Sequence, residues 1–424
     1  MKKKLKKNLK KFYHLCEKEG ILTACKIMGA KEHYKLTKKK QIEKWKANRP
    51  SIVKNRLVFY SSIDYSDNAR ALSDYLVEQG YLKDHEIIWL VSEPEKFKKY
   101  ERPNLKFIQE KYKYAGLRTL ETYKYVYTAE KVFFTHSMRW VKDEDRLSEQ
   151  KFIDLWHGCG YKSAKGKSEN IHFDFVMVPG EVFVDTKTEF FQCERSKVLP
   201  LGYPRYDVML AKRENGKKYI QTFCEGQKED VKIIFWMPTY RMSDNKALTE
   251  DTLSGELNIP IIENMVDMAE LNTVCQKNNV VIILKRHHLQ STYSMKQEFS
   301  NIKYVDDSDL EKADVQLYEA ISWVDALITD YSSVAIDYLL MDRPIAFTLD
   351  DYEKYKESRG FVFENPLEYM PGMHVYDKDN FYDFVKQIGY GKDQWKEERQ
   401  NVIIKTHNRP EEGYCKRIVN YFDI

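Results

Sequence analysis

Apolar residues between residues 56 and 178 gather in short runs, and stretches with helical spacing of apolar residues separate these runs. Asn68–Glu78 is one such helical stretch. Strand-length runs that alternate with helices are typical of βαβ units, whose strands form a parallel sheet. The runs that predict strands here are Arg56–Ser61, Glu86–Val91, Leu105–Gln109, Lys131–Thr135, Phe152–Trp156 and Phe175–Val178.

A second set of short apolar runs follows the polar stretch Lys212–Asp230, and Ile261–Cys275 is a helical stretch between two of them. We therefore predict two successive α/β sheets, that is, two Rossmann-like halves joined by a linker near residue 210. Ligands of such folds bind at the carboxyl ends of the strands, in the cleft between domains. The predicted strands are Val231–Trp236, Val280–Leu284, Ile302–Val305, Ala326–Thr329 and Ile345–Phe347.

The chain thus divides into four predicted parts. Residues 1–50 form a basic helical segment, residues 51–210 and 211–393 form the two α/β domains, and residues 394–424 form a C-terminal helical segment. Hydrophobic residues make up 42% of the chain, which is enough for two sizeable cores.

The basic N-terminal segment carries seven lysines within Met1–Phe12, whereas the net charge of the whole chain is +4. Its apolar residues recur at helical spacing between the lysines. One interpretation is a helix on an anionic membrane surface, where each Lys contributes about 1 kcal/mol. The other is a solvated helix that packs on the domain. We do not expect nucleic acid as a partner, because the lysines accompany no nucleic-acid-binding module.

The cysteines predict a reducing compartment. There are seven, an odd number, and they are scattered without Cys-x-x-Cys spacing, which favours a cytoplasmic protein without a structural zinc site. The N-terminal lysines precede no apolar core of the kind that a signal peptide has. The chain also has no run of about 18 apolar residues, so we expect no segment that spans a bilayer.

His157 follows the predicted strand Phe152–Trp156 and precedes Gly158 and Gly160. A histidine that ends a strand beside glycines lies at the edge of a cleft, where a ligand can approach. This position favours a general base. The alternative is a histidine whose hydrogen bonds are satisfied by a loop carbonyl.

Ser332 and Ser333 occupy a predicted strand-to-helix turn, directly after Asp330 and before the helical run Val334–Met341. Hydroxyls and backbone N–H groups at such a turn can bind an anion such as a pyrophosphate. The alternative is that Asp330 or Ser332 caps the helix.

Two further strand ends carry anion-binding side chains, and parallel strands bring their carboxyl ends to one edge of a sheet. Hydroxyls and cations that converge there suit a diphosphate donor. His287 and His288 could be metal ligands, but adjacent histidines without carboxylates at ligand spacing make a poor site, so we predict no metal ligands here and leave the metal requirement of the enzyme open. The residues at these two ends are Thr239, Arg241, Lys285, Arg286 and His287.

These residues, with several others between about 130 and 420, resemble the CDP-glycerol glycerophosphotransferase family, whose members build teichoic acids and related cell-wall polymers. The stretch Cys159–Lys162 departs from the family pattern, which often has Thr-Pro-Leu-Lys there. The matching motifs are Trp156-His157-Gly158 with Lys162, Gly202-Tyr203-Pro204-Arg205 with Asp207, Pro238-Thr239-Tyr240-Arg241, His287, Thr329-Asp330-Tyr331-Ser332-Ser333, Asp337, Arg343-Pro344 and Arg359-Gly360-Phe361.

The resemblance implies a GT-B-type fold, with the acceptor bound by the N-terminal domain and a CDP-polyol by the C-terminal one. It also implies a cytoplasmic enzyme attached peripherally to the inner face of the plasma membrane, where the lipid-linked polymer acceptor resides. The donor is CDP-glycerol or CDP-ribitol, CMP is released, and no tightly bound cofactor is expected.

The predicted site follows from these motifs. His157 and His287 are the expected catalytic histidines, and Thr239, Arg241, Lys285, Arg286, Asp330, Ser332 and Ser333 are the expected donor-binding residues. Gly158, Lys162 and Arg205 are expected to bind the acceptor or a phosphate.

Two other functions fit parts of the pattern. A GT-B nucleotide-sugar glycosyltransferase in cell-surface polysaccharide synthesis would share the fold and the anion site. A non-enzymatic scaffold that binds through its basic tail would leave the strand-end clusters without a purpose.

Overall fold

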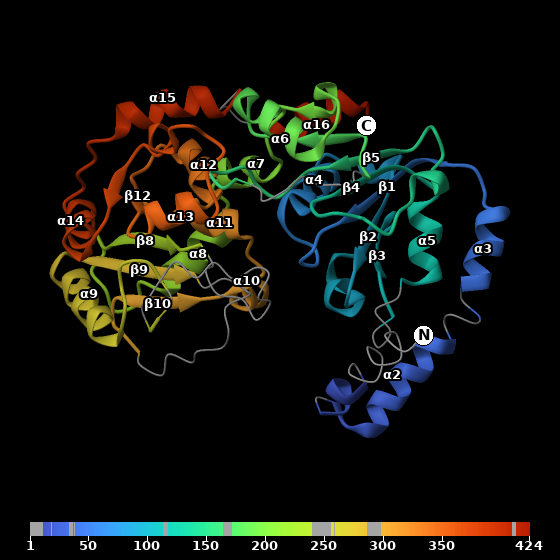
Figure 1. The fold of residues 1–424 in the computed structure, drawn as a ribbon, viewed down its shortest axis with the longest axis horizontal. Coiled ribbons are helices and arrows are strands. Elements are labelled where there is room, and N and C mark those ends of the chain that lie inside the picture. The colour runs from blue at the N-terminus through green and yellow to red at the C-terminus, as the bar shows by residue number, and fades with distance from the viewer. Residues whose placement is uncertain are drawn as a thin grey trace. The chain divides into compact units, whose positions relative to one another are not determined.

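The structure is a computed structural model that describes residues 12–17, 19–33, 37, 39–112, 118–163, 172–239, 256–257, 259–285, 298–408 and 413–424 (Figure 1). The contacts within the chain divide it into two compact units. The first comprises residues 1–155, 172–175 and 424, and the second comprises residues 156–171 and 176–423.

The first unit holds five parallel strands of one sheet, in the order β3-β2-β1-β4-β5. The order reverses direction between β1 and β4, as in doubly wound folds. Each of the three central strands contains a run of at least three buried apolar residues, as expected of a parallel sheet covered on both faces. The strands are β1 (Val53–Tyr60), β2 (Glu86–Val91), β3 (Leu105–Gln109), β4 (Ala129–Phe134) and β5 (Lys151–Asp154).

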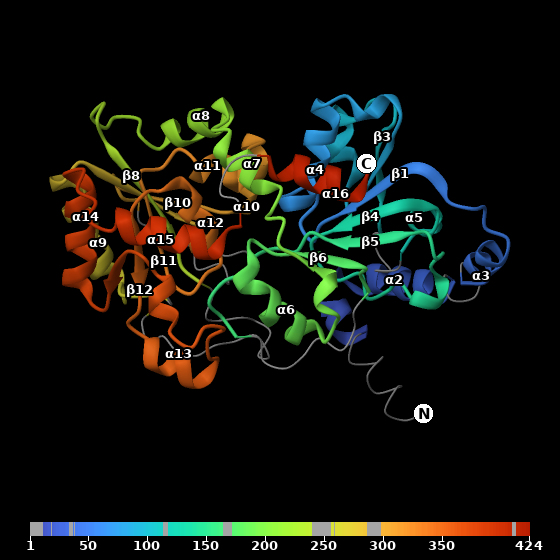
Figure 2. The ribbon, with the colours of Figure 1, turned by 90° about the horizontal axis from the view of Figure 1, so that it is seen from above.

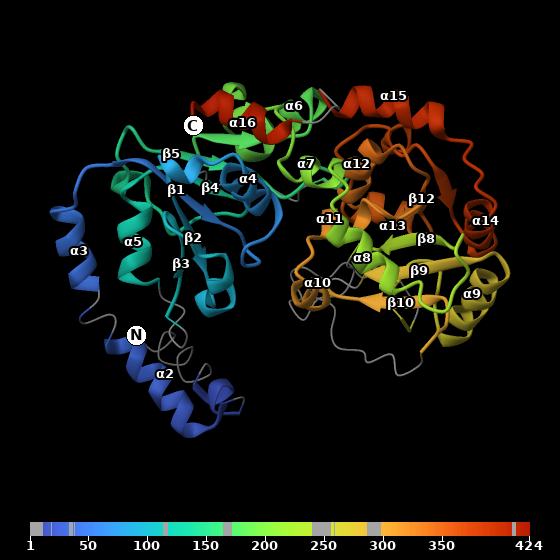
Figure 3. The same cartoon turned by 180° about the vertical axis from the view of Figure 1, so that it is seen from behind.

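Four α-helices of this unit are described in full: α2 (Ile21–His33), α3 (Lys39–Ala47), α4 (Asp67–Glu78) and α5 (Leu120–Val126). Figure 3 shows α3 alongside α5, and the two helices are in contact. The ammonium of Lys46 on α3 pairs with Asp145 and lies 4.8 Å from the centre of the Tyr127 ring. A cation–aromatic contact and an ion pair therefore hold this part of the N-terminal segment.

The second unit contains a six-stranded parallel sheet in the order β10-β9-β8-β11-β12-β13. The direction of the order reverses between β8 and β11. The strands are β8 (Lys232–Met237), β9 (Val280–Lys285), β10 (Ile302–Val305), β11 (Ala326–Thr329), β12 (Ile345–Thr348) and β13 (Met373–Val375).

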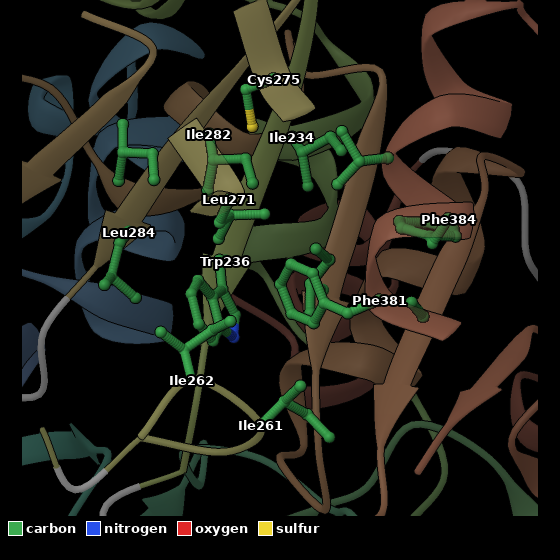
Figure 4. Packing of buried hydrophobic residues seen from close by; sticks show 14 of the residues in the cluster. Ile234, Trp236, Ile261, Ile262, Leu271, Cys275, Ile282, Leu284, Phe381 and Phe384 are labelled. Atoms are coloured by element: carbon green, nitrogen blue, oxygen red, sulfur yellow. The ribbon is translucent and has the colours of Figure 1, made fainter. Parts of the chain in front are cut away.

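Helices α9 (Met265–Lys277) and α14 (Lys378–Gly389) contact each other and cover the same face of this sheet (Figures 1 and 2). Figure 4 shows the core beneath them, where Trp236 of β8 packs against Phe381 of α14 with ring centres 5.0 Å apart. Leu271 and Cys275 of α9 lie in the same cluster and are fully buried. A close-packed hydrophobic core of this kind rigidifies the sheet whose strand ends carry the predicted donor residues.

The other helices connect these strands or follow the last of them. They are α6 (Val184–Phe191), α7 (Arg205–Leu210), α8 (Glu214–Thr222), α10 (Asp307–Ala313), α11 (Leu317–Ile321), α12 (Val334–Tyr338), α13 (Tyr352–Ser358), α15 (Lys396–Thr406) and α16 (Tyr414–Phe422). Strands β6 (Phe175–Met177) and β7 (Val198–Leu199) pair in parallel with each other.

Helix α16 packs on α7, and Asp207 joins the two. The carboxylate of Asp207 accepts hydrogen bonds from the backbone N–H groups of Gly413, Tyr414 and Cys415, at 2.7 to 2.9 Å. A carboxylate at this position satisfies otherwise unpaired N–H groups and complements the helix dipole. Gly202 has φ +79°, and a Cβ there would overlap the Tyr414 ring.

The structure confirms the predicted α/β class and the two successive parallel sheets, and every predicted strand is present. Strands β7 and β13 were not predicted, because two or three residues give no periodic signal. The sequence predicted a linker near residue 210, whereas the contacts divide the chain after residue 155. The difference arises because the segment after β5 contacts α12, as described next.

Candidate functional site

The turn after β11 is tied to the end of β8. The Asp330 carboxylate accepts a hydrogen bond from the backbone N–H of Thr239 at 2.8 Å and another from the Thr239 hydroxyl. Asp330 is fully buried, and Thr239 is nearly so. β8 and β11 are neighbours in the sheet, with Thr329 opposite Met237. The structure therefore brings Thr239 and Asp330 together, as expected for two residues that follow neighbouring parallel strands. Asp330 orients the threonine.

Ser332 and Ser333 lead directly into α12. The Ser332 hydroxyl accepts from the N–H of Val334 at a long 3.4 Å, and Ser333 is the N-cap residue but makes no side-chain capping bond. Tyr331 lies between Asp330 and Ser332 in the sequence and is buried. Its hydroxyl donates to Asp351 at 2.9 Å. Both serines are half-buried. The turn thus presents two hydroxyls on a backbone fixed from behind by a buried tyrosine.

Lys285 is the last residue of β9, where it was predicted, but its surroundings differ from the expectation. Its ammonium pairs with the carboxylate of Asp307 at 2.7 Å, and its side chain is 8% exposed. Because Asp307 already neutralises this charge, Lys285 is a weaker candidate for a phosphate contact than the sequence suggested. Arg241, Arg286 and His287 lie outside the described residues.

His157 lies in the loop after β5, and its side chain is exposed. Its ring centre is 4.1 Å from that of Trp156, which has φ +55° and donates from its indole N–H to the Gly158 carbonyl at 2.7 Å. The Trp156 ring in turn contacts Phe191 edge-on, with centres 5.1 Å apart. The tryptophan therefore supports the imidazole from one side and leaves it accessible.

Gly158 and Gly160 bring this loop onto the turn after β11. A Cβ added at Gly160 would lie 2.8 Å from the Cα and 2.9 Å from the N of Ser333. Gly158 has φ +138°, and a Cβ there would lie 2.9 Å from the Cβ of Ser333. Such distances are too short for any other residue. The structure thus brings Gly158, beside His157, into direct contact with Ser333.

Arg205 is buried and forms an ion pair. One guanidinium nitrogen donates to the Asp337 carboxylate at 2.5 Å, and another donates to the backbone carbonyl of His157 at 3.1 Å. The side chains of Arg205 and Asp337 are 4% and 0% exposed. We predicted that Arg205 contacts the acceptor or a phosphate. In the structure its guanidinium instead donates hydrogen bonds to the Asp337 carboxylate and the His157 carbonyl. No function was predicted for Asp337. A carboxylate within the apolar run Val334–Met341 was nevertheless a signal of a buried ion pair, because a buried charge needs a partner.

Lys162 is fixed by the segment around Gly360. Lys162 forms an antiparallel bridge with Phe361, and the N–H of Val362 donates to the Tyr161 carbonyl at 2.8 Å. The Arg359 guanidinium donates to the Ser163 carbonyl at 2.9 Å. Lys162 and the Arg359-Gly360-Phe361 motif, which are far apart in the sequence, therefore lie side by side.

Cys159, the first residue that departs from the family pattern, is buried and accepts a hydrogen bond from Tyr203 at 3.2 Å. Burial raises the pKa of its thiol. A buried, protonated thiol packs as a small apolar group, so Cys159 is not a candidate nucleophile.

A solvent-open hollow of about 790 Å³ lies in the first unit, between α3 and α5, and contains none of the predicted site residues. Arg56, one of the cations that line it, already pairs with Glu86 at 2.7 Å and donates to Thr128. In the described ranges, no group of three or more His, Cys, Asp or Glu side chains is placed to hold a metal ion. No helix in that part of the chain is long and apolar enough to cross a bilayer.

A family match makes this chain a transferase built on two α/β units. Residues 43–422 match the family described as CDP-Glycerol:Poly(glycerophosphate) glycerophosphotransferase, so the chain belongs to that family. The family resemblance predicted from the sequence is confirmed, and the match favours it over the nucleotide-sugar glycosyltransferase alternative.

Characterised relatives carry several related names. The chain is 28% identical to the teichoic acid glycerol-phosphate transferase of Staphylococcus aureus, over 81% of this chain and 86% of the relative. It is 25% identical to the teichoic acid poly(glycerol phosphate) polymerase of Bacillus spizizenii, over 72% and 76%. It is also 28% identical to the teichoic acid ribitol-phosphate primase of that species, over 54% and 58%.

Solved structures of the wall teichoic acid polymerase TagF share the fold. One has a TM-score of 0.66 at 20% identity and covers 94% of this chain and 95% of its own. A second, from a crystal soaked with CDPG, has a TM-score of 0.68 at 19% identity, with coverage of 94% and 95%. At this level of identity, the similarity shows a shared fold.

Proposed function

We propose that this enzyme transfers glycerol phosphate or ribitol phosphate from a CDP-activated donor to a hydroxyl of a lipid-linked, teichoic-acid-type acceptor, and releases CMP. The observation that carries the proposal is the contact of Gly158 and Gly160 with Ser333. It brings an exposed histidine next to a turn that presents hydroxyls, in a chain of this family. The names of the relatives include both polyols, so the polyol is left to the experiment.

In the proposed reaction, His157 accepts the proton of the acceptor hydroxyl. The hydroxyl oxygen attacks the phosphorus that bears the polyol, and a new P–O bond forms in line with the bond that breaks. CMP leaves with the electron pair of that bond. Phosphoryl transfer depends mainly on positioning and on stabilisation of charge.

The donor diphosphate is proposed to bind at Ser332, Ser333 and Thr239. Hydroxyls that are already oriented stabilise developing charge without reorganising. Asp330 is proposed to act by holding Thr239 in place, since it accepts both the N–H and the hydroxyl of that residue. His287 remains a predicted catalytic residue that stabilises charge at the diphosphate, and Arg241 and Arg286 remain predicted donor contacts. Lys162 remains a predicted acceptor or phosphate contact.

Peripheral attachment to the inner face of the membrane is part of the proposal, because the expected acceptor is lipid-linked. The described helix α2 supports it: Ile21 and Leu22 are 69% and 81% exposed, and lysines follow on the same helix. Co-sedimentation with vesicles of anionic and of neutral lipid tests this, with a chain that lacks Met1–Phe12 as the comparison. Absence of binding to both kinds of vesicle would contradict the attachment, and binding that does not depend on anionic lipid or on these residues would contradict the basic segment as the contact.

The deciding experiment measures CMP release from CDP-glycerol and from CDP-ribitol in parallel, with and without a soluble analogue of the lipid-linked acceptor. Acceptor-dependent CMP from one donor would support the reaction and name the polyol. The absence of CMP from both donors, together with UDP release from a UDP-sugar, would contradict the proposal and support the glycosyltransferase alternative.

A further inference from the structure

The buried pair of Arg205 and Asp337 lies directly behind the predicted catalytic loop. The two Nη atoms of Arg205 point to different partners, one to Asp337 and the other to the carbonyl of His157. This single side chain therefore bridges the backbone of the proposed base and helix α12. A guanidinium suits this task, because its planar fork offers several donors in fixed directions.

The surroundings of Asp337 are built to keep this charge in place. The hydroxyls of Tyr206 and Tyr318 both donate to its carboxylate, in addition to Arg205. Burial, and the nearby Asp337 charge, raise the pKa of Tyr206 well above its usual value, so the phenol stays protonated as a donor. The Arg205 guanidinium also lies 4.6 Å from the centre of the Tyr318 ring. A buried carboxylate that accepts from a guanidinium and two phenols is held in one geometry.

Helix α12 is attached to the His157 loop at two points. At its start, Ser333 contacts Gly158 and Gly160, and one turn later Asp337 reaches the loop through Arg205. The N–H of Asp337 donates to the Ser333 carbonyl at 3.3 Å, so both points belong to the same helical turn. Two attachments to one rigid element fix both the position and the orientation of the loop.

We infer that Arg205 and Asp337 are positioning residues for His157: they hold the proposed base at a fixed distance from the serine turn. Arg205 is then not a ligand of the substrate phosphate. This inference rests on the proposed function of His157 as the base. Displacement of a reacting group by about 1 Å costs on the order of 100-fold in rate, so a residue that never touches substrate has a large effect.

The test uses Arg205→Lys in the full chain. A lysine keeps the charge and the ion pair with Asp337, but its single nitrogen cannot serve both acceptors in the fork geometry. We expect kcat for CMP release to fall about 30- to 100-fold. The Kd of the CDP-polyol, measured by calorimetry, should change by less than about threefold, because no donor contact is lost.

Arg399→Lys is the matched control. Arg399 is fully buried in the same unit and donates to Asp393 at 2.9 and 2.5 Å and to the Asp342 carbonyl at 3.3 Å. None of these partners belongs to the predicted site. This variant should lower the melting temperature as Arg205→Lys does, and kcat at a temperature where both are folded should stay within about twofold of the unsubstituted enzyme.

A second pair of variants keeps the test decisive if Arg205→Lys does not fold. Tyr318→Phe removes one donor from Asp337 and leaves the ion pair. Tyr338→Phe, on α12, removes the hydrogen bond that a buried tyrosine hydroxyl donates to the Val324 carbonyl at 3.1 Å. Tyr318→Phe should lower kcat about 3- to 10-fold at unchanged Kd, and Tyr338→Phe should not.

Equal kcat in Arg205→Lys and Arg399→Lys, or in the two tyrosine variants, would overturn the inference. A rise in donor Kd as large as the loss of kcat would also overturn it and make Arg205 a phosphate ligand. His157→Ala is measured alongside, and full activity of that variant would refute the proposed base itself. Loss of activity in His157→Ala, with the Arg205 outcome negative, would refute the positioning alone.

Discussion

The loop after β5 and the turn after β11 contact each other but are held in different ways. The turn after β11 is held by the neighbouring strand of its own sheet, through the hydrogen bonds of Asp330 to Thr239. The loop after β5 is held by side chains from outside the strands of that sheet. Arg205 of α7 donates to the His157 carbonyl, and Arg359, which follows α13, donates to the Ser163 carbonyl.

The two halves of the site should therefore differ in their sensitivity to remote changes. Sheet pairing, the hydrogen bonds from Thr239 to Asp330 and the bond from Tyr331 to Asp351 fix the turn, so substitutions of other residues should affect it little. The loop depends on close approaches and side-chain contacts from α7, α12 and the segment around Gly360, so substitutions of the residues that make these contacts should displace His157. Substitutions in both halves test this contrast.

His157→Ala removes the group for which the loop is built. We expect CMP release to fall at least about 1,000-fold, because proton transfer and the geometry of attack are both lost. The Kd of the CDP-polyol should stay within about twofold, since the donor hydroxyls are on the turn. A fall in donor affinity as large as the loss of activity would show that His157 binds the donor.

Gly160→Ala separates the loop from the turn without removing a functional group. The new Cβ would lie 2.8 Å from the Ser333 Cα, so the loop must shift, and kcat should fall about 100-fold. Gly29→Ala is the control, because a Cβ at Gly29 meets nothing within 4 Å. Normal kcat in Gly160→Ala would show that the contact does not position His157.

Asp330→Asn tests the turn. Asparagine cannot accept both hydrogen bonds from Thr239 as the carboxylate does, so the threonine hydroxyl is released, and the donor Kd should rise about 10-fold. Asp325→Asn is the control. Asp325 accepts from the N–H of Ile233 at 2.8 Å, near the opposite end of the same strands. Equal donor Kd values for the two variants would contradict the function given to Asp330.

His407 packs against α7, which supports the loop, and should make the stability of the folded chain depend on pH. Its ring is buried, 5.5 Å from that of Tyr206 on α7, and burial lowers its pKa from the usual 6.5 to about 3. Between these pH values, the unfolded chain binds a proton that the folded chain does not. Stability should therefore fall as the pH drops below 6.5, by about 1.4 kcal/mol per pH unit for this proton.

His407→Gln cannot take up that proton, so its loss of melting temperature between pH 7 and pH 5 should be smaller than that of the unsubstituted enzyme. An equal loss in both proteins would show that His407 does not contribute to acid sensitivity.

Much of the fold followed from the sequence, because apolar runs of strand length were sufficient to locate the strands of both sheets. The shared edge of Thr239 and Asp330 was also predictable, since parallel strands place their carboxyl ends together. The pairing of Lys285 with Asp307 was not, because strand order does not tell which carboxylate a long side chain reaches. The contact between Arg205 and Asp337 was hidden for the same reason: both residues stood in recognised motifs, but no local pattern relates α7 to α12.

The cap that Asp207 places on α16 has a consequence for how the protein matures on the ribosome. Cys415, one of the residues whose N–H groups it holds, is synthesised 208 residues after Asp207. Helix α7 carries both Asp207 and Arg205, so its surroundings remain incomplete until these 208 residues have been added. A nascent chain that ends before residue 415 would therefore lack the support of α7, and catalytic competence would arise late, after the strands of both sheets have been synthesised.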